Sequence, residues 1–138
     1  MLRIAGILLV CLAALGGVAL AQSPIRKEPV HFKTGETSAT IKGTIKGDDT
    51  VDYVLGAQKG QSMVVTLAAT NRSAYFNVLP PGSEEAIFIG STSGEKYEGT
   101  LPASGDYTVR LYLMRNAARR GEAASYTIKF AVTGAGAK

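Results

Sequence analysis

The sequence predicts an all-β domain, a single antiparallel β-sandwich of about eight or nine strands. Apolar and polar residues alternate with a period of two along most of the chain after residue 38, as in strands that bury one face. Clusters of glycine, proline and aspartate interrupt this alternation at short intervals, and no long amphipathic helix is visible. Many short strands separated by turns are typical of a sandwich.

The first 21 residues have the features of a cleaved export signal. Arg3 supplies a positive start, residues 4–20 form an apolar run, and Ala19-Leu20-Ala21 places small residues at the cleavage positions. A membrane anchor fits less well, because a run of about 17 residues is at the lower limit for a bilayer span. We therefore expect an exported mature chain, residues 22–138, that forms one β-sandwich domain and has no membrane span.

Composition narrows the classes of function. Cys11 is the only cysteine and leaves with the signal, so the mature domain has no disulfide and depends on its core. Its 117 residues suffice for one domain that buries roughly two-thirds of its unfolded surface. Because Arg3 is the only charged residue of the signal, 14 basic residues remain against 11 acidic ones. This excess weakly favours acidic partners and is too small to indicate nucleic-acid binding.

The elements follow from the alternation, taken in order. His31 lies in the first strand beside Phe32, and residues 86–89 are apolar enough to be buried on both faces. The last two strands are the clearest, because a slip of one residue would expose the whole apolar set. Most tyrosines fall at inward positions, and Tyr112 is the exception. The expected strands after the first are 39–46, 51–55, 63–67, 75–79, 86–89, 97–101, 106–113 and 126–132.

No set of residues indicates an enzyme, a metal site or a cofactor. His31 is the only histidine and has neither a second histidine nor a cysteine to complete a transition-metal site or a catalytic triad. Asp48, Asp49 and Asp52 have oxygen atoms that could hold calcium, but their spacing is not that of an EF-hand. Aspartate is common in turns, so we expect a turn with solvated carboxylates here.

The connection between the last two strands, residues 114–124, is longer than a hairpin needs. It contains Arg115, Arg119 and Arg120 against a single acid, Glu122. One interpretation is a solvated loop that charge keeps soluble. The other is a binding element, since the arginine fork suits carboxylates. Residues 117–124 contain good helix formers that suit one helical turn. If the loop makes a helical turn, Arg115 and Arg119 share a face because they are four positions apart.

A second candidate is the turn at Ser104-Gly105, just before the strand 106–113. Ser104 is either a hydroxyl that caps the turn or an exposed hydrogen-bonding tip, and Tyr107 most simply packs in the core. A straight strand of this length spans about 27 Å and would place Ser104 and the arginines at opposite ends. They share one surface only if the loop folds back or the strand bends.

Several motifs of the chain resemble those of the periplasmic inhibitors of goose-type lysozyme. The resemblance covers most of the mature chain and is densest in Leu101-Pro102-Ala103-Ser104-Gly105-x-Tyr107 and in Arg115-Asn116-x-Ala118-Arg119. It also includes the segments Val30-His31-Phe32-Lys33-Thr34-Gly35, Ile45-Lys46-Gly47-Asp48 and Lys59-Gly60-Gln61, and Tyr53. The sequence departs from the pattern at Asp48-Asp49, where the resemblance leads us to expect an aromatic residue.

The resemblance implies an exported β-sandwich without enzymatic activity whose partner is a g-type lysozyme. It implies that Ser104, Arg115 and Arg119 contact the lysozyme, supported by Tyr107 and Asn116. Glycosidases use carboxylates in a cleft, so a basic loop that fills the cleft would occlude the active site.

Two other functions stay open. One is an exported binding module for polysaccharide, protein or calcium, similar to the sandwich domains appended to secreted peptidases. The other is an envelope protein that binds polyanions.

Overall fold

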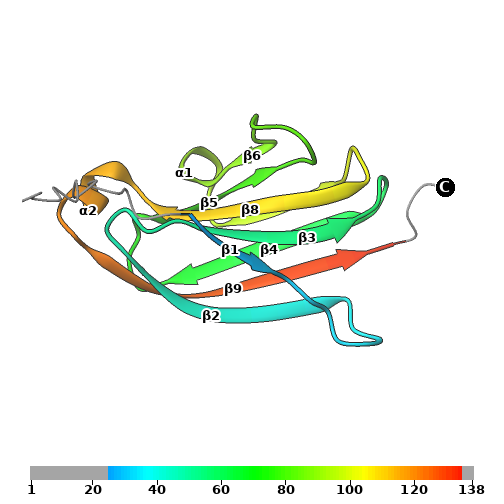
Figure 1. The fold of residues 1–138 in the computed structure, drawn as a ribbon, viewed down its shortest axis with the longest axis horizontal. Coiled ribbons are helices and arrows are strands. Elements are labelled where there is room, and N and C mark those ends of the chain that lie inside the picture. Colours follow the sequence, from blue (N-terminus) through cyan, green and yellow to red (C-terminus); the bar gives the residue numbers. More distant parts are fainter. Residues whose placement is uncertain (1–24, 135–138) are drawn as a thin grey trace, which may run out of the picture.

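A computed structural model describes residues 25–134, so the predicted signal, residues 1–21, lies outside the described residues. Two stacked β-sheets form the molecule, with a short helix at one end (Figure 1). One sheet has the order β1-β3-β8-β5-β6 and the other β2-β9-β4-β7. The described strands are β1 (Arg26–Pro29), β2 (Ser38–Lys46), β3 (Val51–Ala57), β4 (Ser62–Ala69), β5 (Ala74–Leu79), β6 (Phe88–Ile89), β7 (Lys96–Thr100), β8 (Gly105–Leu113) and β9 (Ala123–Thr133). Helices α1 (Gly90–Ser93) and α2 (Arg115–Arg119) complete the described chain.

The predicted all-β sandwich is therefore confirmed. All neighbouring strands of both sheets pair antiparallel except β1, which runs parallel to β3. Over residues 25–134 no helix is long and apolar enough to cross a bilayer.

The core lies between the two sheets and is built by the predicted alternation. The inward residues of β8 and β9 are all buried: Tyr107, Val109, Leu111, Leu113, Tyr126, Ile128, Phe130 and Val132. Tyr53 and Tyr126 join the two sheets through a buried hydrogen bond of 2.6 Å between their hydroxyls, and the Phe130 ring lies 5.4 Å from that of Tyr53. Gly43 lies over the Tyr126 ring, since a Cβ there would come within 2.5 Å of the hydroxyl.

Three expectations for individual elements are wrong. The first strand is Arg26–Pro29, and His31 lies after it on an exposed loop, because the paired segment lies further toward the N-terminus. Residues 86–89 are not buried on both faces, since β6 is a two-residue edge strand and Ile87 and Ile89 are 40% and 45% exposed. Tyr75 faces outward opposite Tyr112, because Ala74, Phe76 and Val78 take the inward positions of β5.

Candidate functional site

The connection between β8 and β9 forms one helical turn, α2. Its hydrogen bonds run from the Ala118 amide to the Met114 carbonyl (2.9 Å) and from the Arg120 amide to the Asn116 carbonyl (3.3 Å). Ala117 and Ala118 are buried against the sandwich, which is where small residues with high helix propensity fit best. Gly121 ends the turn with a φ of 67°, a conformation that favours glycine. The predicted helical turn is present, but it begins at Arg115 rather than at residue 117.

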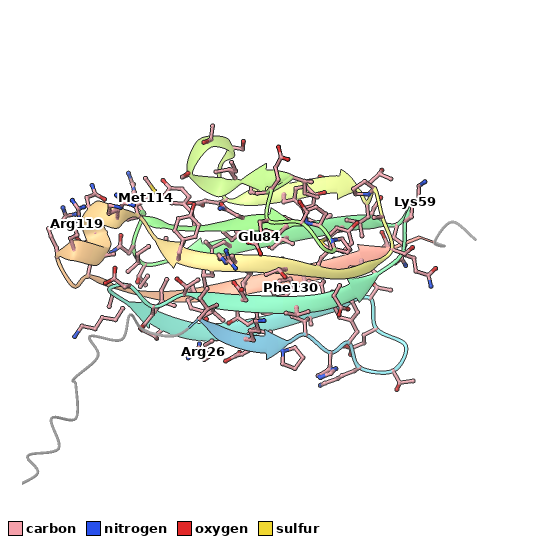
Figure 2. The ribbon with its side chains drawn as sticks, turned by 45° about the horizontal axis from the view of Figure 1, so that its top comes forward. Arg26, Lys59, Glu84, Met114, Arg119 and Phe130 are labelled. Atoms are coloured by element: carbon pink, nitrogen blue, oxygen red, sulfur yellow. The ribbon has the colours of Figure 1, made fainter. Side chains whose placement is uncertain are left out.

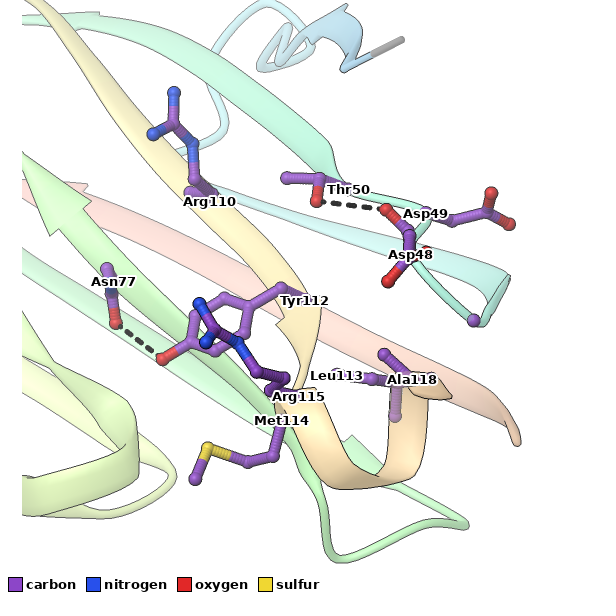
Figure 3. A pocket seen from close by; sticks show the side chains of 11 residues that line it. Asp48, Asp49, Thr50, Asn77, Arg110, Tyr112, Leu113, Met114, Arg115 and Ala118 are labelled. Atoms are coloured by element: carbon purple, nitrogen blue, oxygen red, sulfur yellow. Dashed lines mark hydrogen bonds between the residues drawn. The ribbon is translucent and has the colours of Figure 1, made fainter. Parts of the chain in front are cut away.

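The helix α2 begins and ends with an arginine. Arg115 and Arg119 are both exposed, as is Asn116 between them. Arg115 borders the outer face of β8, next to Tyr112 (Figure 3). Figure 2 shows Arg119 at the extreme end of the sandwich, pointing away from the sheets.

The third arginine of the loop has a different role. Arg120 Nε donates to Glu122 Oε2 at 2.5 Å, so this charge is compensated within the loop. A hydrogen bond from Asn71 and the Arg120 guanidinium hold the pKa of the Glu122 carboxyl below its usual value. Within residues 25–134 no ion pair involves Arg115 or Arg119. These two arginines are therefore the uncompensated charges of the loop.

A hollow of about 500 Å³ lies beside α2, between the β2–β3 turn and the outer face of β8 (Figure 3). The Gly47 amide donates to the Glu122 carbonyl at 2.8 Å and so ties the β2–β3 turn to the arginine loop. The Tyr112 hydroxyl donates to Asn77 Oδ1 at 3.1 Å across one wall. The hollow is lined by Gly47, Asp48, Asp49, Thr50, Asn77, Arg110, Tyr112, Leu113, Met114, Arg115 and Ala118.

Sequence reasoning missed an ion pair between a buried aspartate and a partly exposed arginine next to this hollow. Asp52 is 3% exposed, and its two carboxylate oxygens accept from Arg110 Nε at 2.8 Å and Nη2 at 3.0 Å. This bidentate bond raises the pKa of Arg110. The signal was present in the sequence, because aligning the strands 51–55 and 106–113 places Asp52 opposite Arg110 on the outward face.

The same pair separates the three aspartates that could have held calcium. Both oxygens of Asp52 are engaged with Arg110, and Asp49 Oδ2 accepts from the Lys46 amide at 3.1 Å. Over the described part of the chain, no three His, Cys, Asp or Glu side chains are grouped to hold a metal ion.

The Ser104 turn lies at the other end of the sandwich. Ser104 Oγ accepts from the Lys59 amide at 2.8 Å, so it bridges the β7–β8 and β3–β4 turns. Figure 2 shows Lys59 and Arg119 at opposite ends of the molecule, joined by unbroken strands. The structure therefore brings Arg115, Asn116 and Arg119 together but not Ser104.

Tyr107, also predicted to support binding, is fully buried. Its hydroxyl donates to the Ala103 carbonyl at 2.6 Å and accepts from the Ala103 amide at 3.2 Å. Tyr107 has no surface with which to contact a partner, so its role is confined to holding the turn that carries Ser104. An inward position on β8 explains this burial, which sequence alternation already indicated.

The fold and this end of the molecule define a class of protein: a β-sandwich that carries a short helix with two exposed arginines at one end. No family model matches the sequence. A curated relative from Escherichia coli (strain K12), an inhibitor of g-type lysozyme, is 32% identical over 102 residues, which cover 72% of this chain and 75% of the relative. The chain therefore belongs to the family of inhibitors of g-type lysozyme.

Solved structures of the same family agree with this assignment. PliG from Aeromonas hydrophila, a periplasmic inhibitor of g-type lysozyme, has a TM-score of 0.75 and 38% identity, with 80% of this chain and 99% of that chain covered. PliG from Salmonella Typhimurium has a TM-score of 0.63 and 29% identity over 78% of this chain and 98% of its own. These relatives are named inhibitors, and the chain is accordingly not an enzyme.

The resemblance to domains of secreted peptidases extends to the fold alone. The pre-peptidase C-terminal domain of a Bacillus anthracis collagenase superimposes with a TM-score of 0.52 at 15% identity, covering 80% of this chain and 96% of that chain. At this identity the likeness concerns the arrangement of strands and not a shared ligand.

Proposed function

We propose that this chain is a periplasmic inhibitor of g-type lysozyme that blocks the active-site cleft with α2. The observation that carries the proposal is the pair Arg115 and Arg119, both exposed on the helical turn α2 and without an acidic partner among residues 25–134. Glycosidase clefts contain paired carboxylates, and arginine is the side chain best suited to bind them. Family membership supports g-type lysozyme as the partner.

The scaffold supports tight binding because it holds α2 in place before the partner arrives. Both ends of the loop are hydrogen bonded to neighbouring turns, and Ala117 and Ala118 are anchored in the sandwich. A pre-organised element loses less conformational freedom on binding, so more of the contact energy is retained as affinity. Arginines at the centre of a desolvated interface are typical hot spots.

We assign the direct contacts to Arg115, Asn116 and Arg119, with the hollow beside Arg115 available to receive a side chain of the lysozyme. Ser104 is a separate point of contact at the opposite end, and Tyr107 supports it from inside. Asp48 and Asp49 border the hollow on the side of the β2–β3 turn. Like charges repel each other, so we expect Asp48 and Asp49 to face the wall of the lysozyme cleft and not its carboxylates.

The test is the lysis of bacterial cell walls by goose-type and chicken-type lysozymes, each with and without purified residues 22–138. We expect the goose-type enzyme to be inhibited in a dose-dependent way that more cell-wall substrate overcomes. Undiminished lysis at a large excess of the protein would contradict the proposed function. The chicken-type enzyme measures how selective the inhibition is.

A further inference from the structure

We propose that the β4–β5 turn, residues 70–73, positions the arginine helix α2, and that Asn71 is the positioning residue. The inference rests on the proposed function, since it concerns how the binding element is held. Asn71 lies 51 residues before Glu122 in the chain. The turn touches the loop at both ends of α2 and leaves its exposed side open.

The contacts of the turn enclose α2 from both sides. Before the helix, the Met114 amide donates to the Ser73 carbonyl at 2.8 Å. After the helix, Asn71 Nδ2 donates to Glu122 Oε1 at 3.0 Å and to the Ala123 carbonyl at 3.2 Å. One turn of four residues therefore fixes where the loop leaves β8 and where it enters β9.

The Asn71 side chain is itself held in one orientation. Its Oδ1 accepts from the Ser73 amide at 2.9 Å, which leaves Nδ2 to face the loop. Exchanging the amide oxygen and nitrogen would break both sets of bonds at once, so they define a single arrangement. Asn71 thus acts as a rigid strut between its own turn and Glu122.

Glu122 connects Asn71 to the C-terminal end of α2. One carboxylate oxygen accepts from Asn71 and the other from Arg120, the residue that follows α2. Asn71, Glu122 and Arg120 together form a clamp that holds the loop. Arg115 and Arg119 belong to the proposed binding surface. This division explains why one of three neighbouring arginines has an acidic partner within the loop.

A helix of five residues needs such a clamp. Isolated helices of this length do not form in water, so α2 exists only through its tertiary contacts. Ala117 and Ala118 anchor it, but their small side chains leave its orientation loosely defined. If the clamp is broken, a smaller fraction of molecules presents both arginines correctly, and the apparent dissociation constant rises by the same factor.

The experiment replaces the side-chain amide of Asn71, which donates to Glu122 and to the Ala123 carbonyl. Asn71→Asp keeps the acceptor for the Ser73 amide but places a carboxylate against Glu122. The double variant Asn71→Asp/Glu122→Gln restores a hydrogen bond with donor and acceptor exchanged. The matched control is Gln61→Glu, because Gln61 Nε2 donates to the Gly134 carbonyl at 2.9 Å at the opposite end of the sandwich. Asn71→Ser, which is neutral and too short to reach Glu122, is a second test that does not introduce a charge.

Two readouts separate positioning from contact. In the free protein, we expect amide hydrogen exchange of Ala118 and Gly121 to accelerate about tenfold in Asn71→Asp and Asn71→Ser, and to return toward the original rate in the double variant. In binding to goose-type lysozyme, we expect the association rate to fall about tenfold with little change in dissociation. Gln61→Glu should change neither.

The inference is overturned if these amides exchange at the original rate in both Asn71 variants. It is also overturned if binding is weakened through the dissociation rate alone, as for a direct contact. Failure of the unmodified protein to bind any lysozyme would refute the proposed function instead. The exchange rates in the free protein would still decide whether Asn71 holds α2.

Discussion

At one end of the sandwich, α2 exposes Arg115, Asn116 and Arg119, whereas at the other end the polar groups of the Ser104 turn are bonded to backbone atoms of the domain. Ser104 Oγ caps the Lys59 amide, and the Tyr107 hydroxyl holds both polar atoms of Ala103. The fold therefore uses the side chains of Ser104 and Tyr107 but does not need those of Arg115 and Arg119. The strands would connect equally well without the two free arginines, so their exposure is best explained by a partner.

The largest effect should come from breaking the α2 end. We expect Arg115→Ala and Arg119→Ala each to weaken inhibition of goose-type lysozyme by roughly 2–4 kcal/mol, because each removes a charged donor from a desolvated interface. Inhibition constants measure this, and thermal melting should show an intact fold. Lys59→Ala removes one positive charge at the opposite end and is the matched control. Unchanged inhibition in the double arginine variant would exclude occlusion by α2.

The next effect concerns the other end and should appear in stability. Tyr107→Phe removes a hydroxyl with two hydrogen bonds to Ala103, so we expect the free energy of unfolding to fall by about 1–2 kcal/mol. Inhibition by the folded variant should change little, since Tyr107 has no exposed surface. Chemical denaturation measures the first quantity and the lysis assay the second. A large loss of inhibition at full stability would mean that Tyr107 acts on the partner after all.

Ser104→Ala tests the contribution of a single atom, Ser104 Oγ, at the end opposite α2. It removes the acceptor of the Lys59 amide, and we expect a loss of about 0.5–1.5 kcal/mol in the free energy of unfolding. Because Ser104 lies far from α2, its contribution to binding should be smaller than that of either arginine. Binding titrations at equal folded concentration test this order. A Ser104 effect as large as that of Arg119 would place the main contact at the wrong end.

The smallest effect is a pH dependence of the α2 end. Asn71 and Arg120 lower the pKa of Glu122, so the ionised carboxylate is favoured in the folded protein. Its contribution is therefore complete above the pKa of the unfolded chain, and it is lost as the pH falls through the lowered value. Titration of the Glu122 carboxyl by NMR should give a midpoint below 4.5, its ordinary value. A midpoint at or above that value would show that the clamp does not act on the carboxylate.

The features that sequence predicted well depend on near neighbours in the chain. The period of two in β8 and β9 follows from local alternation, and every residue predicted to face inward there is buried. The helical turn in the arginine loop was expected because alanines and arginines favour helix. The observed turn begins at Arg115, two residues before the predicted segment.

The features that sequence missed join residues far apart in the chain. Asp52 and Arg110 are separated by 58 positions, and Asn71 and Glu122 by 51, so no local pattern links them. The separation of Ser104 from the arginines depended on whether β8 bends, and the strand is continuous over Gly105–Leu113. Tyr75 was assigned to the wrong face because Ala74, Phe76 and Val78 take the inward positions of β5.

The central claim is that α2 fills the active-site cleft of a g-type lysozyme. A crystal structure of residues 22–138 bound to goose-type lysozyme tests it most directly. We expect the guanidinium groups of Arg115 and Arg119 to lie inside the cleft, within hydrogen-bonding distance of its carboxylates. An empty cleft, with the inhibitor bound elsewhere on the enzyme, would contradict the account.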